Sequence, residues 1–151
     1  IGESFSPESF DLATACVSLQ DTHDPSAVIA AVHRVLKSGA RFVFCNTHPC
    51  TDTPYRRWVK DEAGRKTALE IAGYFDRGPI EFEWKSSRYK YDWTTTGIHA
   101  PLSDWISWIV DAGFKIERME EPVPTPEAIS RAPELEDACI APYFVIFDVR
   151  K

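Results

Sequence analysis

Residues 9–47 read SFDLATACVSLQDTHDPSAVIAAVHRVLKSGARFVFCNT, and this stretch decides the fold. Its first part, residues 10–17, is apolar and carries no charge after Asp11. A short run that is apolar throughout predicts a strand buried on both faces, as in a parallel sheet. Residues 41–45 predict a second strand. Two strands joined by one packed helix predict a right-handed parallel βαβ unit.

A helix connects these two strands. Asp24 can accept hydrogen bonds from the free N–H groups of a first turn, and Pro25 suits the first helical position because it has no N–H to satisfy. Gly39 predicts the end of the helix as a left-handed cap. The apolar stripe that should face the sheet consists of Val28, Ile29, Val32, Val35 and Leu36.

The middle of the chain, residues 48–100, predicts an irregular insertion. Residues 54–60 and residues 67–74 fit two short helices. Residues 80–96 are rich in aromatic side chains that alternate imperfectly, which predicts a β-hairpin turning at residues 85–87. Connections of this length are more often functional lids than filler, so we expect the insertion to act as a lid.

The C-terminal part predicts a helix over residues 103–112, which Ser103 caps and Gly113 stops. Three further elements complete the prediction: a half-exposed edge strand at residues 114–119, a short helix at residues 126–131 and a central strand at residues 143–149.

Composition restricts the class of protein. The chain has 151 residues and is 44% hydrophobic, which is enough for one domain with a genuine core. Its formal net charge is -6 and it has no basic run, so nucleic acid is a poor candidate partner. No apolar stretch approaches the roughly 20 residues that span a bilayer, and the start does not resemble a signal peptide. We therefore expect a soluble cytoplasmic protein without a membrane partner.

Four cysteines occur in the chain, at Cys16, Cys45, Cys50 and Cys139. They form no CxxC pair and lie mostly among apolar residues, so zinc ligation and a disulfide framework are both weak interpretations. Buried reduced thiols are the favoured interpretation, and we expect no metal site.

Residues 10–49 resemble the fourth strand, the following helix and the fifth strand of the class I S-adenosylmethionine-dependent methyltransferases. The family pattern "RVLKPGG" is matched by RVLK at residues 34–37, while Ser38 and Ala40 replace the usual proline and second glycine. Downstream, YFD, HAPLS, DAGF and EPVP resemble the lid and C-terminal half of the small-molecule branch, although Ala100 stands where "HRPLS" has arginine.

The resemblance implies an α/β fold, namely a partial Rossmann-like methyltransferase fold. Its mixed sheet would have three parallel strands and one antiparallel C-terminal strand, inserted between the second and third, plus the lid at about residues 48–100. The family's glycine-rich cofactor turn is absent, so residues 1–151 correspond to the C-terminal portion of a single domain. We expect the bare edge of the first strand to be covered by a missing N-terminal half or by self-association.

The carboxyl ends of parallel strands are where ligands bind in such a sheet. Cys16, Val17 and Gln20 follow the first strand and are predicted to bind S-adenosyl-L-methionine, and Asp21 is predicted to bind the substrate. The resemblance adds Glu3 and Ser4 to the cofactor site, because the segment Gly-Glu-Ser corresponds to a "GD" that meets the adenine amino group in relatives.

Two histidines are candidate catalytic residues. His48 follows the second strand and, as an imidazole, can act as a base near neutral pH. The alternative for His48 is a histidine that only caps a loop. His99 lies at the foot of the lid and matches a histidine that is frequent in relatives, so it is a candidate to face the substrate.

Aromatic residues of the insertion can wall a site for a planar substrate, since they offer broad apolar surface with a polar tip. The cluster consists of Trp58, Trp84, Tyr89, Tyr91 and Trp93, and the predicted substrate-binding residues of this kind are Tyr74, Trp84, Tyr91 and Trp93. The alternative is an ordinary hydrophobic minicore under a long lid.

The predicted function is S-adenosylmethionine-dependent methyl transfer to a small molecule, with little or no activity in this chain alone. The alternative is a non-catalytic binding or scaffolding domain that keeps the fold, which the altered LKSGA segment and Ala100 favour slightly. A protein or RNA substrate is a third interpretation, and the acidic balance and aromatic insertion count against RNA.

Overall fold

The computed structural model describes residues 4–84 and 92–151. Its helices are α1 (Pro25–Val35), α2 (Leu102–Asp111), α3 (Pro126–Arg131) and the 3-10 helix η1 (Pro133–Cys139). One sheet contains β1 (Phe10–Cys16), β2 (Leu36–Thr47), β7 (Lys115–Glu120) and β8 (Phe144–Arg150). Two hairpins, β3 (Tyr55–Lys60) with β4 (Lys66–Ala72) and β5 (Gly78–Trp84) with β6 (Trp93–His99), lie between β2 and α2 in the chain.

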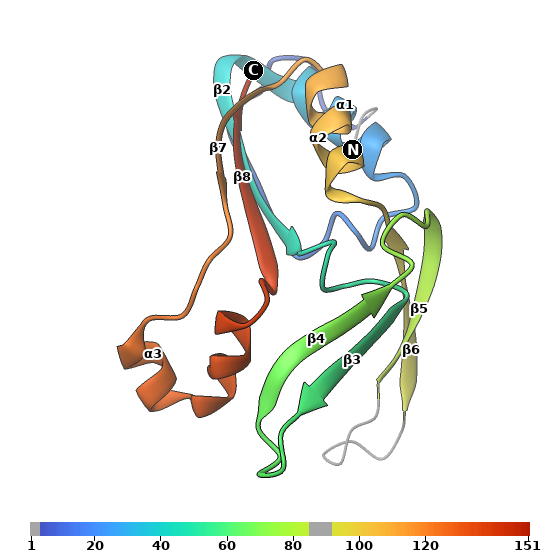
Figure 1. Cartoon of the computed structure of the whole chain (residues 1–151). Helices are drawn as coiled ribbons and strands as arrows, with labels where there is room; N and C mark the ends of the chain where they lie inside the picture. The colour runs from blue at the N-terminus through green and yellow to red at the C-terminus, as the bar shows by residue number, and fades with distance from the viewer. Residues whose placement is uncertain (1–3, 85–91) are drawn as a thin grey trace.

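The main sheet has the predicted topology. Its strand order is β1-β2-β8-β7, with β1 parallel to β2 and β8 antiparallel to both of its neighbours. The C-terminal strand therefore lies between the second and third strands of the parallel set, as predicted for the mixed sheet. The hairpins extend away from the end of the sheet at which β2 finishes (Figure 1).

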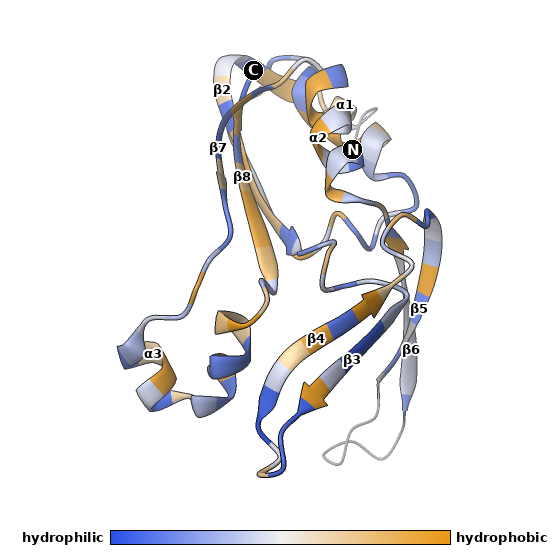
Figure 2. Ribbon diagram, in the orientation of Figure 1, coloured by the Kyte–Doolittle hydropathy of each residue, from blue (hydrophilic) through white to orange (hydrophobic). Residues whose placement is uncertain are grey.

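The core lies between the sheet and the helices α1 and α2, which cover the same face (Figure 1). Phe42 and Phe44 of β2 stack with their ring centroids 4.8 Å apart, and Phe147 of β8 stacks on Phe44 at 5.1 Å. Ile29 of α1 and Ile109 of α2 close this layer, and both are fully buried. Figure 2 shows apolar colouring on β8 and on α2, and further apolar segments on the β3–β4 hairpin.

Strand β1 is far less buried than its sequence predicts. It lies at the sheet edge, where Phe10 is 38% exposed and Leu12 is 55% exposed. Only Ala13 and Ala15 pack against the core. The prediction of a strand buried on both faces is therefore wrong for the part of the chain that the structure describes, because α1 and α2 cover a single face.

Helix α1 begins as predicted and ends earlier. The side chain of Asp24 accepts a hydrogen bond from the N–H of Ala27, and Pro25 occupies the first turn. The helix ends at Val35, so the prediction that Gly39 caps it is wrong. The N–H of Ser9 donates to the carbonyl of Val35 at 2.8 Å. This hydrogen bond satisfies one of the carbonyls left without a partner at the end of the helix, which a glycine cap would otherwise do.

The first half of the insertion differs from the prediction. Residues 54–60 and 67–74 contain the paired strands β3 and β4, so the two predicted helices are wrong. Asp61 makes the turn between them, since its carboxylate accepts from the backbone N–H groups of Ala63 and Arg65. The pairing of β5 with β6 confirms the second predicted hairpin, and its predicted turn at residues 85–87 lies outside the described residues.

In the C-terminal half, helices α2 and α3 confirm the sequence prediction. Gly113 follows α2 with a φ of +94°, as a left-handed stop should. Ser103 does not cap α2, because the helix begins after Pro101 and has no side-chain cap at that residue. Instead the N–H of Leu102 donates to the hydroxyl of Tyr74 at 3.2 Å.

None of the helices in the described ranges is long and apolar enough to cross a membrane.

Candidate functional site

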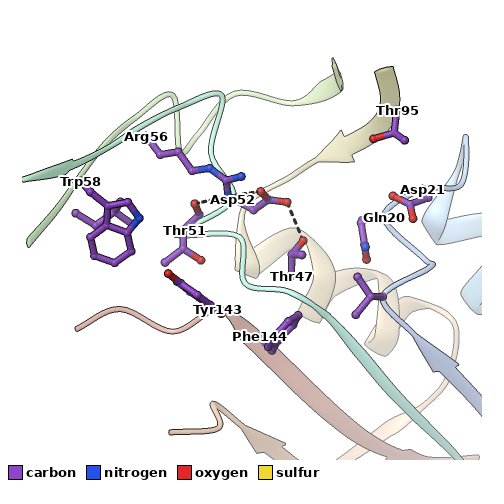
Figure 3. A pocket seen from close by; sticks show the side chains of 12 residues that line it. Gln20, Asp21, Thr47, Thr51, Asp52, Arg56, Trp58, Thr95, Tyr143 and Phe144 are labelled. Atoms are coloured by element: carbon purple, nitrogen blue, oxygen red, sulfur yellow. Dashed lines mark hydrogen bonds and ion pairs between the residues drawn. The ribbon is translucent and has the colours of Figure 1, made fainter. Parts of the chain in front are cut away.

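A cavity of about 480 Å³ opens where β1 and β2 end (Figure 3). Its lining comes from segments that are distant in the chain: the loop after β1, the loop after β2, the β3–β4 hairpin, β6 and the start of β8. The lining residues are Val17, Gln20, Asp21, Thr47, Thr51, Asp52, Arg56, Trp58, Leu69, Thr95, Tyr143 and Phe144.

The loop after β1 is held in a defined shape. Val17 has a φ of +46°, which is unusual for a β-branched residue and marks a strained turn of the kind found at functional sites. Its N–H donates to the carbonyl of Cys45 at 2.7 Å. Further along, the carbonyl of Gln20 accepts from the N–H of Ile98 at 2.6 Å, which ties this loop to β6.

Gln20 and Asp21 are neighbours in the lining of the cavity. Gln20 is only 8% exposed, and its Oε1 has no hydrogen-bond partner among the described residues. Asp21 lies nearer the solvent, and burial together with the negative charge of Asp52 raises the pKa of its carboxyl.

Asp52 organises the loop after β2. Its Oδ2 accepts from the hydroxyl of Thr47 at 2.8 Å, and its Oδ1 accepts from Nη1 of Arg56 at 2.6 Å (Figure 3). The same Arg56 nitrogen lies 3.2 Å from the carbonyl of Thr51. The guanidinium charge is thus largely neutralised within the loop.

The other end of the cavity is aromatic. The rings of Trp58 and Tyr143 meet edge to face, with centroids 6.3 Å apart. Lys66 lies 4.7 Å from the centroid of the Trp58 ring and pairs with Asp137, whose carboxylate also accepts from the hydroxyl of Tyr143 at 3.3 Å. These contacts tie the β3–β4 hairpin to η1 and β8.

His48 is a structural histidine in this geometry. It is 3% exposed, and its Nδ1 accepts from the N–H of Cys50 at 3.2 Å. Its Nε2 lies 2.8 Å from Oε1 of Glu121. Burial lowers the pKa of His48 below the ordinary 6.5, although Glu121 opposes this shift. Both ring nitrogens are occupied and the side chain does not line the cavity, so the geometry favours the loop-capping interpretation over a free base.

The lowered pKa of His48 predicts a pH-dependent stability. An unfolded chain binds a proton to His48 at a higher pH than the folded chain does, so the free energy of unfolding should decrease as pH falls through about 6.5. Burial lowers the pKa of His33 as well and adds to the slope. We expect His48→Gln to reduce the slope between pH 7 and pH 5, measured by urea unfolding. His23→Gln, at an exposed histidine, is the matched control, and an unchanged slope in His48→Gln would contradict the assignment.

His99 also has both nitrogens occupied. Nδ1 lies 3.0 Å from the carbonyl of Asp52, and Nε2 lies 3.1 Å from the carbonyl of Tyr74. These carbonyls precede and follow the β3–β4 hairpin, so the buried ring joins the two ends of that hairpin. His99 does not line the cavity, and its position favours the role of supporting the insertion.

The structure brings together only part of the predicted site. Val17, Gln20 and Asp21 line the cavity, whereas Cys16 is exposed on β1 outside it. Ser4, Tyr74 and Trp93 do not line the cavity. The side chain of Trp84 lies outside the described part of the chain. Glu3 and Tyr91 lie outside the described residues altogether.

Sequence reasoning missed several lining residues. Asp52 and Arg56 were placed in a loop and a helix, and Tyr143 was treated only as the start of a strand. The THPCTDT segment after a parallel strand was a signal for Asp52, because such strand ends gather polar ligand-binding groups. Arg56 required the hairpin itself, which sequence reasoning did not predict.

Comparisons with known proteins agree with the topology. The methyltransferase-domain family profile matches residues 2–44. No sequence among the curated proteins matches the chain. A solved S-adenosylmethionine-dependent methyltransferase from Mesorhizobium loti is 27% identical, with a TM-score of 0.81 over 97% of this chain and 64% of its own. A putative one from Listeria monocytogenes is 22% identical, with a TM-score of 0.81 over 98% of this chain and 64% of its own.

The fold is also shared with a protein of other chemistry. The [4+2]-cyclase SpnF is 15% identical, with a TM-score of 0.52 over 98% of this chain and 52% of its own. That likeness concerns the fold alone.

The cavity fits one side of the cofactor that the two methyltransferases use. Val17 and the unpartnered Oε1 of Gln20 stand at the carboxyl end of a parallel strand, where such ligands bind. The seven glycines of the chain include no GxG pair. The chain spans 64% of the length of both methyltransferase structures. The partial family match and the likeness in fold are consistent with a fragment of a class I S-adenosylmethionine-dependent methyltransferase, a class whose cofactor is S-adenosylmethionine.

Proposed function

We propose that the protein transfers a methyl group from S-adenosylmethionine to a small molecule that binds in the cavity described above. The observation that carries the proposal is the position of this cavity, at the carboxyl ends of the parallel strands β1 and β2 and under the β3–β4 hairpin. Its volume of about 480 Å³ is in the range of small-molecule sites, and its lining combines apolar walls with a few polar groups.

Bound S-adenosylmethionine supplies an activated methyl group, so the protein has mainly to align the acceptor and exclude water. In our proposal Val17 and Gln20 border the cofactor side of the cavity. Trp58 and Tyr143 hold the acceptor at the other end. The insertion of residues 48–100 acts as the lid, with the β3–β4 hairpin held against η1 by the Lys66–Asp137 pair.

The test is transfer of a deuterated methyl group from the cofactor to a panel of small planar acceptors, followed by mass spectrometry with the complete gene product. A methylated acceptor supports the proposal. Cofactor that binds and is not consumed with any acceptor counts against it.

A non-catalytic or differently acting domain is the second candidate. It is favoured by the two buried histidines, His48 and His99, whose ring nitrogens are all engaged within the protein. The fold likeness to a [4+2]-cyclase illustrates that this architecture is compatible with other chemistry. Binding of a small molecule without any methyl transfer would support this candidate.

A further inference from the structure

The β3–β4 hairpin stands apart from the sheet that forms the core. In the part of the chain that the structure describes, β3 and β4 pair only with each other, and they run away from the main sheet (Figure 1). The base of the hairpin is fixed, because the two nitrogens of the buried His99 ring lie 3.0 and 3.1 Å from the carbonyls of Asp52 and Tyr74. An element that is held at its base and pairs with no other strand can move as one unit about that base.

A β-bulge turns Lys66 toward the cavity side of the hairpin. Trp58 and Leu69 are register partners on β3 and β4, and both line the cavity. Side chains three residues apart on a regular strand point to opposite faces, so Lys66 would face away from Leu69. The pairing register shifts after Val59, which leaves Thr67 as an extra residue in β4. Lys66 consequently lies over the Trp58 ring, 4.7 Å from its centroid.

Lys66 joins the hairpin to a distant part of the chain. Its ammonium pairs with the carboxylate of Asp137 on η1, and the two side chains are only 30% and 21% exposed. The same carboxylate accepts from the hydroxyl of Tyr143 at 3.3 Å, and the ring of Tyr143 meets Trp58 edge to face. These four residues form one network, which we call the latch. Partial burial and shared partners make such a network stronger than an isolated surface pair.

The latch lies at the boundary of the cavity. Trp58 and Leu69 supply the hairpin side of the lining, and Tyr143 and Phe144 supply the other side. Figure 3 shows Trp58 and Tyr143 at the same end of the cavity. Separation of the two sides would widen this end, whereas the loop after β1 at the opposite end is tied to β6 by a backbone hydrogen bond. The aromatic end is therefore the end that can open.

We propose that the β3–β4 hairpin is the gate of this cavity, and that a ligand enters or leaves at the aromatic end when the Lys66–Asp137 pair separates. This inference rests on the proposed function for the use of the cavity, and it adds the entrance and the contact that controls it. A charge pair weakens as salt screens the two charges. Access to the cavity should therefore increase with ionic strength, which a purely apolar lid would not show.

Hydroxyl-radical footprinting read by mass spectrometry measures the exposure of individual side chains in the complete protein, without cofactor or ligand. Asp137→Asn and Lys66→Gln should each raise the modification rates of Leu69 and Tyr143 about threefold, the order of effect for the loss of one partly buried charge pair. Asp137→Asn leaves Lys66 in place over the Trp58 ring, so it separates opening from the simple uncovering of that ring. Raising the ionic strength from about 0.02 M to 0.5 M should produce the same change in the unsubstituted protein.

Arg57→Gln is the matched control, because Arg57 is also a cation of the hairpin and its partner Glu70 belongs to the same hairpin. It should leave these rates unchanged. Trp105, which is 3% exposed in the core, reports on global unfolding. Unchanged rates in both latch variants would overturn the proposal, as would the lack of a salt response in the unsubstituted protein. An equal rise at Trp105 would also overturn it, because unfolding would then explain the exposure. No methyl transfer is measured, so a failure here leaves the methyl-transfer assay to judge the proposed function separately.

Discussion

Replacing Phe147 by alanine should lower the free energy of unfolding by about 3–5 kcal/mol. Phe147 is fully buried on β8 between β2 and β7, and its ring stacks on Phe44 with centroids 5.1 Å apart. The substitution removes apolar surface from the core and leaves a cavity in the layer that joins the sheet to α1 and α2. Urea unfolding followed by circular dichroism measures the change.

Phe75→Ala is the matched control for this substitution. Phe75 is 75% exposed in the loop after β4, and its removal should change stability by no more than about 0.5 kcal/mol. If the two substitutions proved equally mild, the sheet described here would not be the folding core of the protein.

Titration of this 151-residue chain with S-adenosylhomocysteine should give no binding tighter than about 1 mM, which corresponds to roughly 4 kcal/mol. Of the residues predicted to bind the cofactor, only Val17 and Gln20 line the cavity in the described part of the chain. They include neither a glycine-rich turn nor the acidic residue that holds the ribose hydroxyls in folds of this type. Most of the polar contacts to such a cofactor are therefore missing from the chain.

The Mesorhizobium loti methyltransferase, which is 27% identical, is a suitable positive control in the same buffer. Micromolar binding by the chain would contradict the prediction. It would mean that residues 1–151 form a complete cofactor site by a route that the cavity geometry does not suggest.

The βαβ unit was predictable because its signals are local and agree with one another. An apolar strand, the Asp24-Pro25 helix start and a second apolar strand leave few topologies open. The exposure of β1 was harder to predict from the sequence, because burial depends on what covers a strand as well as on its residues. The early end of α1 likewise depends on a long-range contact, the donation from Ser9 to the carbonyl of Val35.

The β3–β4 hairpin was misread because its apolar residues imitate a helix. Tyr55, Trp58 and Val59 fall at i, i+3 and i+4, which is a helical spacing. The decisive signal was the turn, in which Asp61 binds two backbone N–H groups and Gly64 has a φ of +80°. A D-x-x-G turn flanked by residues of strand propensity argues for a hairpin.

One edge of the candidate site was predictable from a single rule. Strand ends placed Val17, Gln20 and Asp21 at the cavity, because the carboxyl edge of a parallel sheet is where ligands bind. Of the aromatic wall, Trp58 on β3 belongs to the cluster expected from the sequence, whereas Tyr143, just before β8, does not. Only the folded insertion brings Trp58 to Tyr143, and no local pattern reports a contact over that distance.

The strained turn at Val17 has a consequence for the entropy of binding. Its left-handed backbone is fixed by the N–H bond to Cys45, and the loop that follows is fixed again by the Ile98–Gln20 bond. A ligand that enters the cavity therefore meets a wall whose shape exists before it arrives, and little of the binding free energy is consumed in ordering that wall. Selection of the ligand at this edge then depends on fit to a rigid template rather than on adaptation of the loop.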